Sequence, residues 1–420
     1  MEKLSKRPCR ALTHAWLLSL ATLLLAACAT PQLRPASEPT PVLLVSIDGF
    51  HPDYLEFEEA VTLRRLAAAG ALAEWMTPAY PTLTFPNHYT VVTGLHPDRH
   101  GIIHNSMSDP DLGRFGLHLR DAVGDGRWWG GEPIWLTAQR QGLRAATLFW
   151  PGSEADIQGE RPDEWLPYDG RKSHEDRVDR VLGWMAQPQA QRPHFMTLYF
   201  EAVDSMGHAH GPGTPQVRAA IAAVDAALAR LLDGLEALGQ RGMVNMLITS
   251  DHGMTWLDTD NPIVLDDLLP ADAIDWVHFG QVAGVNPRAG HEAAVEQALL
   301  RPHPRMSCHR RGELPERWHY GSHPRVPAIT CQAVPPHSIL PRRAVNQPNR
   351  RPNRGGHGYD NALPEMRAFF LAHGPAFQAG VRLPPVEAVD VYPLMTRLLG
   401  LRAAEHQGNP AAFDAALLPR

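Results

Sequence analysis

The sequence MVNMLITSDHG, residues 243–253, contains the pattern that decides the fold. Its apolar part, Met243–Thr249, is typical of a strand buried inside a parallel sheet, and Asp251 and His252 follow where that strand ends. Three other runs have the same character: Pro41–Ile47, Leu143–Phe149 and His194–Phe200. Helical patterns separate several of these runs. The sequence therefore predicts an α/β fold, with a mostly parallel central sheet covered by helices on both faces.

Two segments between the strands carry helix signals. Thr214-Pro215 supplies an N-cap and a proline at the first helical position, and apolar residues then recur at helical spacing: Ile221, Val224, Leu228, Leu231 and Leu235. A second helix is expected from Leu63 to Ala69, where Gly70 ends it. Near the C-terminus, Glu387–Leu399 predicts a closing helix that Pro393 perturbs.

The alternation of strands and helices stops between about residues 261 and 353. Val277–Val285 could form a strand and His291–Leu300 a helix, and the rest is rich in proline, arginine and histidine. We therefore expect one domain over residues 41–400, with a small α+β lobe inserted at about 261–353 and a C-terminal tail at 401–420.

The composition favours a globular protein and argues against one class of partner. Of the 420 residues, 44% are hydrophobic and 20% are charged, which is typical of a chain with a packed core. The net charge is −6, and no basic run is interleaved with aromatic residues. Binding to a nucleic-acid duplex through a basic surface is therefore not expected.

The N-terminus predicts export. Four basic residues precede an apolar stretch that ends in Leu25-Ala26-Ala27-Cys28. This ending resembles a bacterial lipobox, so we expect residues 1–27 to be a lipoprotein signal peptide, Cys28 the lipidated residue and residues 28–40 a tether. The protein would then be periplasmic or in the cell envelope, and lipid-anchored to a membrane. An uncleaved membrane anchor is the alternative, and it also exports the protein.

Cysteine usage agrees with export. Cys9 and Cys28 belong to the leader and its lipidation site, which leaves only Cys308 and Cys331 in the mature domain. Two cysteines in an oxidising compartment most simply form one disulfide, so we expect these two to be bonded to each other.

Acidic and imidazole side chains follow three of the four predicted strands. Asp48 follows the first, Asp204 and His208 follow the third, and Asp251 and His252 follow the fourth. Ligands of an open α/β sheet bind beyond the carboxyl ends of its strands, so we expect these side chains to share one edge. Asp48 alone could be a turn residue, and Asp204 with His208 a local hydrogen-bonded pair. Together, their oxygen and imidazole ligands suit zinc.

The segment PTLTFPNH, residues 81–88, lies between the first two strands. The residues after it, YTVVTG at 89–94, can start a helix, which would place the Thr84 amide near the positive end of a helix dipole. Such an end binds phosphate and lowers the cost of an alkoxide nearby. The alternative is a turn with incidental threonines.

Five segments, in this order along the chain, resemble the nucleotide pyrophosphatase/phosphodiesterase family of the alkaline phosphatase superfamily. They are the strand ending in Asp48-Gly49, Pro81–Gly94, Asp204 with His208 before Gly211-Pro212, Asp251–Met254, and Gly356–Tyr359. The resemblance spans about residues 40–400. It implies an alkaline-phosphatase-like core. It also implies an enzyme that hydrolyses phosphodiester and pyrophosphate bonds of nucleotides to nucleoside monophosphates, through a covalent intermediate on Thr84.

The same resemblance implies two Zn²⁺ ions and their ligands. The first ion would be held by Asp48, Thr84, Asp251 and His252, and the second by Asp204, His208 and His357. Asn105 would join the Thr84 amide in holding a phosphate oxygen. Phe85, Tyr168 and Tyr199 match positions that sandwich a nucleobase in the family, although the Tyr199 ring could equally pack in the core.

Differences from other members of the superfamily narrow the expected activity. A sulfatase would have Cys or Ser at position 84 followed by x-Pro-x-Arg, whereas the chain has Thr84-Phe85-Pro86-Asn87. A phosphomonoesterase would have an arginine over the phosphate and a third metal site, and neither is evident. Three aspartates and the Thr84 alkoxide would balance two zinc ions, and a near-neutral site favours a diester over a monoester.

Two other functions stay open at this point. One is a phospholipid head-group (choline-type) phosphodiesterase of the same superfamily, and the other is an inactive zinc-binding lipoprotein. The segment Leu314–His323 also resembles the family, but the sequence does not assign it a role.

Overall fold

The computed structural model describes residues 39–348 and 351–419. The predicted signal peptide, the tether up to residue 38 and the lipidation of Cys28 lie outside the described residues. Among the residues that are described, no helix combines the length and the apolar character needed to cross a membrane.

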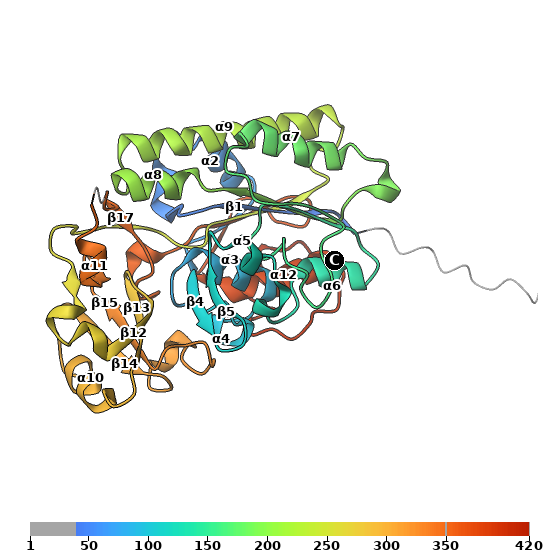
Figure 1. Ribbon diagram of the computed structural model, residues 1–420. Coiled ribbons are helices and arrows are strands. Elements are labelled where there is room, and N and C mark those ends of the chain that lie inside the picture. The colour runs from blue at the N-terminus through green and yellow to red at the C-terminus, as the bar shows by residue number, and fades with distance from the viewer. Residues whose placement is uncertain (1–38, 349–350, 420) are drawn as a thin grey trace, which may run out of the picture. The chain divides into compact units, whose positions relative to one another are not determined.

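An eight-stranded sheet forms the centre of the described domain, in the order β19-β2-β18-β9-β1-β8-β6-β7 (Figure 1). Its strands are β1 (Val42–Ile47), β2 (Ala71–Ala73), β6 (Ala145–Leu148), β7 (Glu164–Leu166), β8 (Phe195–Phe200), β9 (Asn245–Thr249), β18 (Phe370–His373) and β19 (Val381–Leu383). The four predicted strands correspond to β1, β6, β8 and β9, which are neighbours and pair in parallel. Antiparallel pairing within this sheet occurs only where β18 pairs with β9 and β2. The predicted mostly parallel α/β sheet is confirmed.

Helices cover both faces of this sheet because its central strands are apolar on both sides. Leu43, Val45 and Ile47 of β1 join one cluster of buried side chains, and Val42 and Leu44 join a second cluster on the other face. The helices on the first face are α2 (Val61–Ala68), α7 (His174–Met185), α8 (Ala202–His210) and α9 (Pro215–Ala237) (Figure 1). The second face carries α3 (Thr84–Thr93), α6 (Ile134–Arg140) and α12 (Val391–Leu398). Two short helices, α4 (Pro97–His100) and α5 (Arg120–Val123), lie in the connections.

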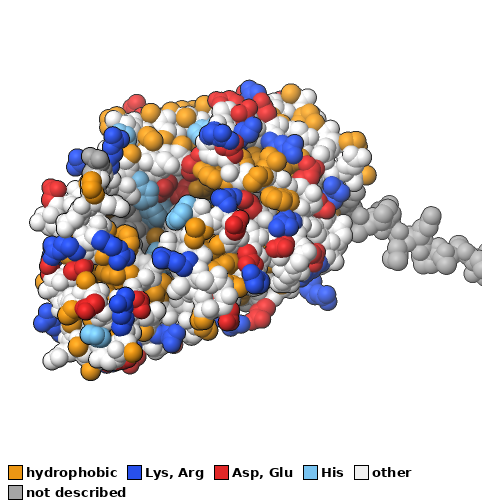
Figure 2. Space-filling model, in the orientation of Figure 1, with side chains coloured by type: hydrophobic (Ala, Val, Ile, Leu, Met, Phe, Trp, Pro, Cys, Tyr) orange, Lys and Arg blue, Asp and Glu red, His pale blue; other side chains and the backbone are white. Residues whose placement is uncertain are grey.

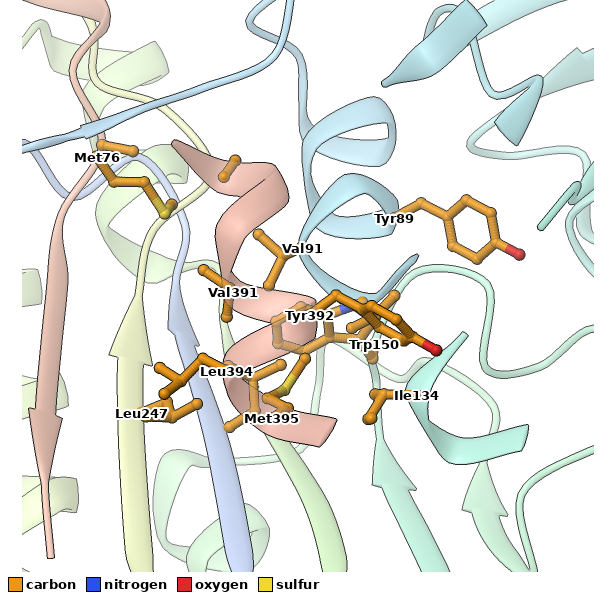
Figure 3. Packing of buried hydrophobic residues seen from close by; sticks show 14 of the residues in the cluster. Met76, Tyr89, Val91, Ile134, Trp150, Leu247, Val391, Tyr392, Leu394 and Met395 are labelled. Carbon is orange, nitrogen blue, oxygen red and sulfur yellow. The ribbon is translucent and has the colours of Figure 1, made fainter. Parts of the chain in front are cut away.

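The second cluster holds α3 in place. Val91 of α3 belongs to the same cluster as Leu247 of β9 and as Val391 and Leu394 of α12, and Figure 3 shows it beside Val391. All four side chains are at most 2% exposed. Burying an apolar side chain of this size contributes about 1.5–3 kcal/mol, so α3 is firmly fixed against the sheet.

The C-terminal helix differs from its prediction. It was expected over Glu387–Leu399, but α12 covers only Val391–Leu398, after a 3₁₀ turn at Ala388–Asp390. Pro393 lies in the first turn of α12, where a backbone N–H has no helical partner, so the proline does not perturb the helix. The residues after α12 return over the second cluster, in which Phe413 is buried.

Residues 274–333 contain a separate sheet of four antiparallel strands in the order β12-β13-β15-β14. The strands are β12 (Ile274–His278), β13 (Val282–Pro287), β14 (Met306–Arg310) and β15 (Ile329–Ala333), and α10 (Glu292–Leu299) packs with them around a third cluster of buried side chains. The single strand expected at Val277–Val285 is wrong. The chain reverses there at Gly280, whose φ of +137° suits glycine, and makes the hairpin of β12 and β13.

Cys308 of β14 and Cys331 of β15 face each other across the ladder and are joined by a disulfide. The remaining strands form short pairs: β3 (Met76–Thr77) with β20 (Val386–Glu387), β4 (Ser106–Asp109) with β5 (Gly113–Gly116), β10 (Thr255–Trp256) with β17 (Gly355–Gly356), and β11 (Ile263–Val264) with β16 (Ile339–Leu340). A short helix, α11 (Arg342–Val345), follows β16.

Candidate active site

Polar side chains from two neighbouring strands meet beyond the carboxyl ends of the central sheet. Asp48 follows β1, and Asp251 and His252 follow β9. Asp48 Oδ1 lies 3.6 Å and Asp251 Oδ2 2.9 Å from His252 Nε2. One ligand atom from each of the three residues lies within 4.8 Å of the others, so a single cation could bind all three.

A second group of possible ligands lies next to the first and shares His252 with it. Asp204 and His208 come from α8, and His357 follows β17. The Nε2 atoms of His208 and His357 are 3.0 Å apart, and they lie 3.5 and 3.6 Å, respectively, from Asp204 Oδ1. Asp204, His252 and His357 also fall within 4.8 Å of one another. The rings of His252 and His357 stack with centroids 3.5 Å apart, so the two groups form one continuous site.

The three histidines have the same orientation. Nδ1 of His208 donates to the Gly355 carbonyl, Nδ1 of His252 to the Gly253 carbonyl and Nδ1 of His357 to the Thr82 carbonyl, each at 2.9 Å. These hydrogen bonds leave each Nε2 as the nitrogen that is free to bind a cation. Metal-ligating histidines are typically oriented in this way by a hydrogen bond from the other nitrogen.

Three carboxylate oxygens in the site have no hydrogen-bond partner although they are buried. They are Asp48 Oδ1, Asp204 Oδ1 and Asp251 Oδ2. Burying carboxylates without partners is costly, and a bound cation would remove that cost. Oxygen and imidazole donors together fit zinc in particular. The residues of the site therefore fit a group of two metal ions.

The electrostatics of the site agree with this interpretation. Burial, followed by the charges of Asp251 and Asp204, raises the pKa of Asp48 well above its usual value. Burial, followed by the charges of His252 and His208, lowers the pKa of His357 well below its usual value. The repulsion that Asp48 meets from the other carboxylates, beside the neutral imidazole of His357, suits a bound cation.

Thr84 is the first residue of α3, so the helix begins at the predicted nucleophile. Its Oγ lies 3.5 Å from His252 Nε2. The Asn105 side chain accepts a hydrogen bond from the Phe85 amide at 2.9 Å, which brings Asn105 beside the N-terminus of α3. Thr84, the three aspartates, the three histidines and Asn105 therefore lie together.

His88 is a site residue that sequence reasoning missed. It lies on α3 and is 1% exposed. Nδ1 donates to the Thr84 carbonyl at 2.9 Å and lies 3.4 Å from Asp251, and Nε2 lies 2.8 Å from the Ser46 hydroxyl. Its position in the PTLTFPNH segment, one helical turn after Thr84, is the signal that could have identified it.

The predicted aromatic residues differ in exposure. Phe85 is partly buried against Phe115 and Trp129, with ring centroids 6.0 and 5.9 Å away. Tyr168 is 40% exposed, and its ring meets that of Tyr199 edge-on at 6.2 Å. The Tyr199 ring is buried, and its hydroxyl donates to Asp48 Oδ2 at 2.6 Å. Core packing, the alternative interpretation of Tyr199, agrees with this burial.

A partly buried ion pair lies near Tyr168, and no sequence pattern indicated it. The Arg177 guanidinium is buried, donates to Glu201 at 2.8 Å and also donates to the Tyr199 carbonyl at 2.8 Å. Burial, followed by the charge of Glu201, raises the pKa of Tyr168 to about 12. The phenol of Tyr168 therefore stays protonated and neutral at neutral pH.

The segment Leu314–Arg325 returns from the separate sheet to the core and contacts the loops of the site. The Trp318 ring stacks on Tyr80, just before the PTLTFPNH segment, with centroids 4.0 Å apart. The Tyr320 hydroxyl donates to the Ile103 carbonyl at 3.3 Å. Arg325 donates to the Gly101 carbonyl at 2.9 Å and to Asp109 at 2.8 Å. We call this segment the strap. It bonds to residues that lie before and after Asn105, on both sides of the loop that carries Asn105.

One face of the molecule is hollowed, and histidine side chains gather at the hollow with acidic and hydrophobic side chains beside them (Figure 2). Because His208, the most exposed of the three histidines, is 28% exposed at its side chain, a solute can reach this end of the site.

Comparison with known proteins gives a consistent result. The chain matches the family described as "Type I phosphodiesterase / nucleotide pyrophosphatase" over residues 42–360. It is 35% identical over 398 residues to mouse ectonucleotide pyrophosphatase/phosphodiesterase family member 1, covering 92% of this chain and 43% of the relative. It is also 35% identical to a venom phosphodiesterase of Naja atra, covering 89% of this chain and 46% of the relative. The chain thus spans less than half the length of these curated relatives.

A solved structure covers the same region. Murine ectonucleotide pyrophosphatase/phosphodiesterase 5, as an inactive variant in complex with AMP, superposes with a TM-score of 0.84 at 35% sequence identity. The match covers 90% of this chain and 100% of that one, so it includes the described domain.

Proposed function

The chain belongs to the type I phosphodiesterase / nucleotide pyrophosphatase family, and we propose that it hydrolyses phosphodiester and pyrophosphate bonds of nucleotides to nucleoside monophosphates. The observation that carries this proposal is the site itself: Thr84 Oγ lies 3.5 Å from a histidine that belongs to both ligand groups. A relative whose solved structure contains AMP supports a nucleotide as the substrate.

We assign the two ligand groups to two Zn²⁺ ions. Asp48, Thr84, Asp251 and His252 would hold the first ion, and Asp204, His208 and His357 the second. When bound, zinc would supply the positive charge that makes a threonine hydroxyl ionise at neutral pH and that stabilises charge on phosphorus-bound oxygens.

The residues of the chain account for the remaining steps. Thr84 Oγ releases its proton to solvent and attacks phosphorus, and the bond from phosphorus to the leaving oxygen breaks with its electron pair remaining on that oxygen. Water then attacks phosphorus, and the bond from phosphorus to Thr84 Oγ breaks. A proton from that water passes to Thr84 Oγ and restores the hydroxyl, and the nucleoside monophosphate is released. The N-terminus of α3 and the side chain of Asn105 would hold a phosphate oxygen through these changes, because both lie beside Thr84.

Phe85 and Tyr168 are the side chains that we assign to the nucleobase. Phe85 is only partly buried and Tyr168 is 40% exposed, so both present ring surface outside the packed core. A base held by aromatic rings gains about 1–3 kcal/mol from each stacking contact. Tyr199 remains a predicted third member of this slot.

We also infer that the protein works outside the cytoplasm, as an exported lipoprotein. Two observations support this location: the Cys308–Cys331 disulfide, and the names of relatives as ectonucleotide and venom enzymes.

The proposal is tested by measuring metal and activity together. The purified protein is expected to contain about two zinc ions per chain and to hydrolyse a nucleotide diester. Thr84→Ala should lose turnover but keep most of its zinc, because the carboxylate and imidazole ligands remain. Ser205→Ala, which removes an exposed hydroxyl next to Asp204, serves as the matched control and should keep wild-type activity. Active wild-type protein without zinc, or an active Thr84→Ala variant, would overturn the proposal.

A further inference from the structure

A cavity of about 580 Å³ lies close to the site but outside the ligand groups. Its walls include Asp258, Phe279, Gln281, Ser338, Arg343 and Asn353, and we call it the distal cavity. Gln281 and Leu257, which also lines it, flank Gly356, so only the loop that carries His357 separates the cavity from the site. The volume lies in the range of ligand-binding pockets, about 300–1,000 Å³.

The distal cavity adjoins the part of the site that contains His208 and His357. A row of side chains leads from Thr84 to the cavity. Thr84 Oγ is 3.5 Å from His252, whose ring stacks on His357, and His357 Nε2 is 3.0 Å from His208 Nε2. The Asn353 amide then lies 3.1 Å from His208 Nδ1 and lines the cavity. In an in-line displacement the leaving group departs on the side of phosphorus opposite the attacking oxygen, so a substrate held between Thr84 and His208 would release its leaving group toward the cavity.

The charges in the cavity wall favour an anion. Arg343 and Arg351 both line it, and neither forms an ion pair within the described residues. Asp258 is the acidic residue of the wall, but its carboxylate accepts hydrogen bonds from the Asp260 and Asn261 amides and from the Asn261 side chain. The Asp258 carboxylate is thus bonded within its own loop, and the wall carries two guanidinium groups against this one carboxylate.

We propose that the distal cavity binds a phosphate-bearing leaving group, such as the pyrophosphate released from a nucleoside triphosphate. This inference rests on the proposed function and specifies its substrate class. Arg343 and Arg351 would bind the departing phosphates, and Phe279, which is 45% exposed, offers a ring to a base when the leaving group is itself a nucleotide. A choline leaving group fits less well, because its positive charge would face the two arginines.

The test compares two substrates that differ only in the leaving group. One is a nucleoside triphosphate, which releases pyrophosphate, and the other is the nitrophenyl ester of the same nucleoside monophosphate. The quantity compared is the kcat/KM for the triphosphate divided by the kcat/KM for the nitrophenyl ester. Arg343→Ala should lower this ratio about 5- to 10-fold, because the variant loses one charged contact at an exposed site. The wild-type ratio should also fall as salt is added, and this salt dependence should weaken in the variant.

Arg342→Ala is the matched control, because Arg342 is the next residue, is exposed, and pairs with Asp267 instead of lining the cavity. It should leave the ratio unchanged. If the wild-type protein is active on both substrates but Arg343→Ala keeps the wild-type ratio, this inference is wrong and the proposed function stands. If the wild type hydrolyses a choline phosphodiester with a higher kcat/KM than the nucleoside triphosphate, the cavity takes a cationic head group and the inference is overturned. A metal-loaded wild type that is inactive on both substrates overturns the proposed function and this inference with it.

Discussion

At the scale of single residues, the site is organised by hydrogen bonds that orient the predicted ligands. His208, His252 and His357 each use Nδ1 on a backbone carbonyl, and Tyr199 holds Asp48. Such contacts to ligand residues typically change metal affinity or activity by about 10- to 100-fold when they are removed. The geometry of the site therefore depends on these surrounding contacts as well as on the ligands.

At this scale, the prediction concerns the stacking of the Tyr168 ring on the nucleobase. If its ring stacks on the nucleobase, Tyr168→Ala should lower kcat/KM for a nucleotide substrate about 10-fold while changing hydrolysis of a small aryl diester little. Tyr168→Phe keeps the ring and should keep the preference for the nucleotide. Steady-state kinetics on both substrates measures this difference. Equal losses on the two substrates in Tyr168→Ala would contradict the stacking role.

Some of the proposed metal ligands could be predicted from local sequence patterns and others could not, for physical reasons. Asp48, Asp204 and Asp251 were predicted from their strands alone, because parallel strands bring their carboxyl ends to one edge. His357 lies in a loop far along the chain, and only the family resemblance, which is now confirmed, singled it out. Glu201 could not be recognised because its partner, Arg177, lies on another element and no local pattern links the two.

At the scale of elements, the strap explains why a segment of the lobe resembles the family. Tyr320 and Arg325 bind backbone carbonyls on the loop just before Asn105, and Trp318 supports the chain before Thr84. The strap thus links the separate sheet to both phosphate-holding parts of the site. Its role depends on contacts between elements that are distant in sequence, which is why periodicity could not reveal it.

Substitution of Arg325 tests whether the strap positions Asn105. If it acts by positioning Asn105, Arg325→Ala should lower kcat about 10-fold in the wild-type background and cause little further loss in an Asn105→Ala background. Arg317→Ala is the matched control, because Arg317 lies on the strap but pairs with Asp360. Thermal unfolding would show that the variants are folded. Equal losses of kcat in both backgrounds would mean that Arg325 only stabilises the fold.

Other elements show where local patterns were sufficient. The long helix α9 begins at Pro215, directly after the predicted N-cap. A helix was expected to start within residues 89–94, whereas α3 begins earlier, at Thr84, and ends at Gly94, whose φ of +66° suits glycine. The hairpin of β12 and β13 was missed because its turn, around Gly280, interrupts a run that is otherwise apolar. A short apolar run does not by itself reveal a reversal of the chain.

At the scale of the whole molecule, buried histidines make stability depend on pH. Burial lowers the pKa of His96 to about 4 and of His100 and His278 to about 3, whereas an unfolded chain has histidine pKa values of about 6.5. Because the folded pKa values are lower, the unfolded state binds more protons below pH ~6.5. Stability is therefore fully present above that pH and is lost as the pH falls toward the folded values.

Each of these histidines should lower the free energy of unfolding by up to about 2 kcal/mol between pH 7 and pH 5. Denaturant unfolding at the two pH values measures the change. His278→Phe keeps a ring that can stack on His104 but cannot be protonated, so its loss of stability should be smaller by up to about 2 kcal/mol. Replacing the exposed His118 by Gln should not alter the change. Equal stability of the wild type at both pH values would contradict this account.

The central claim is that Thr84 forms a covalent bond to phosphorus, and the stereochemistry at phosphorus tests it most directly. A nucleotide diester made chiral with sulfur is hydrolysed in water enriched in a heavy oxygen isotope, and the configuration of the product is read by phosphorus NMR. Two successive in-line displacements, first by Thr84 and then by water, predict overall retention of configuration. Inversion would mean a single displacement by water and would contradict the role assigned to Thr84.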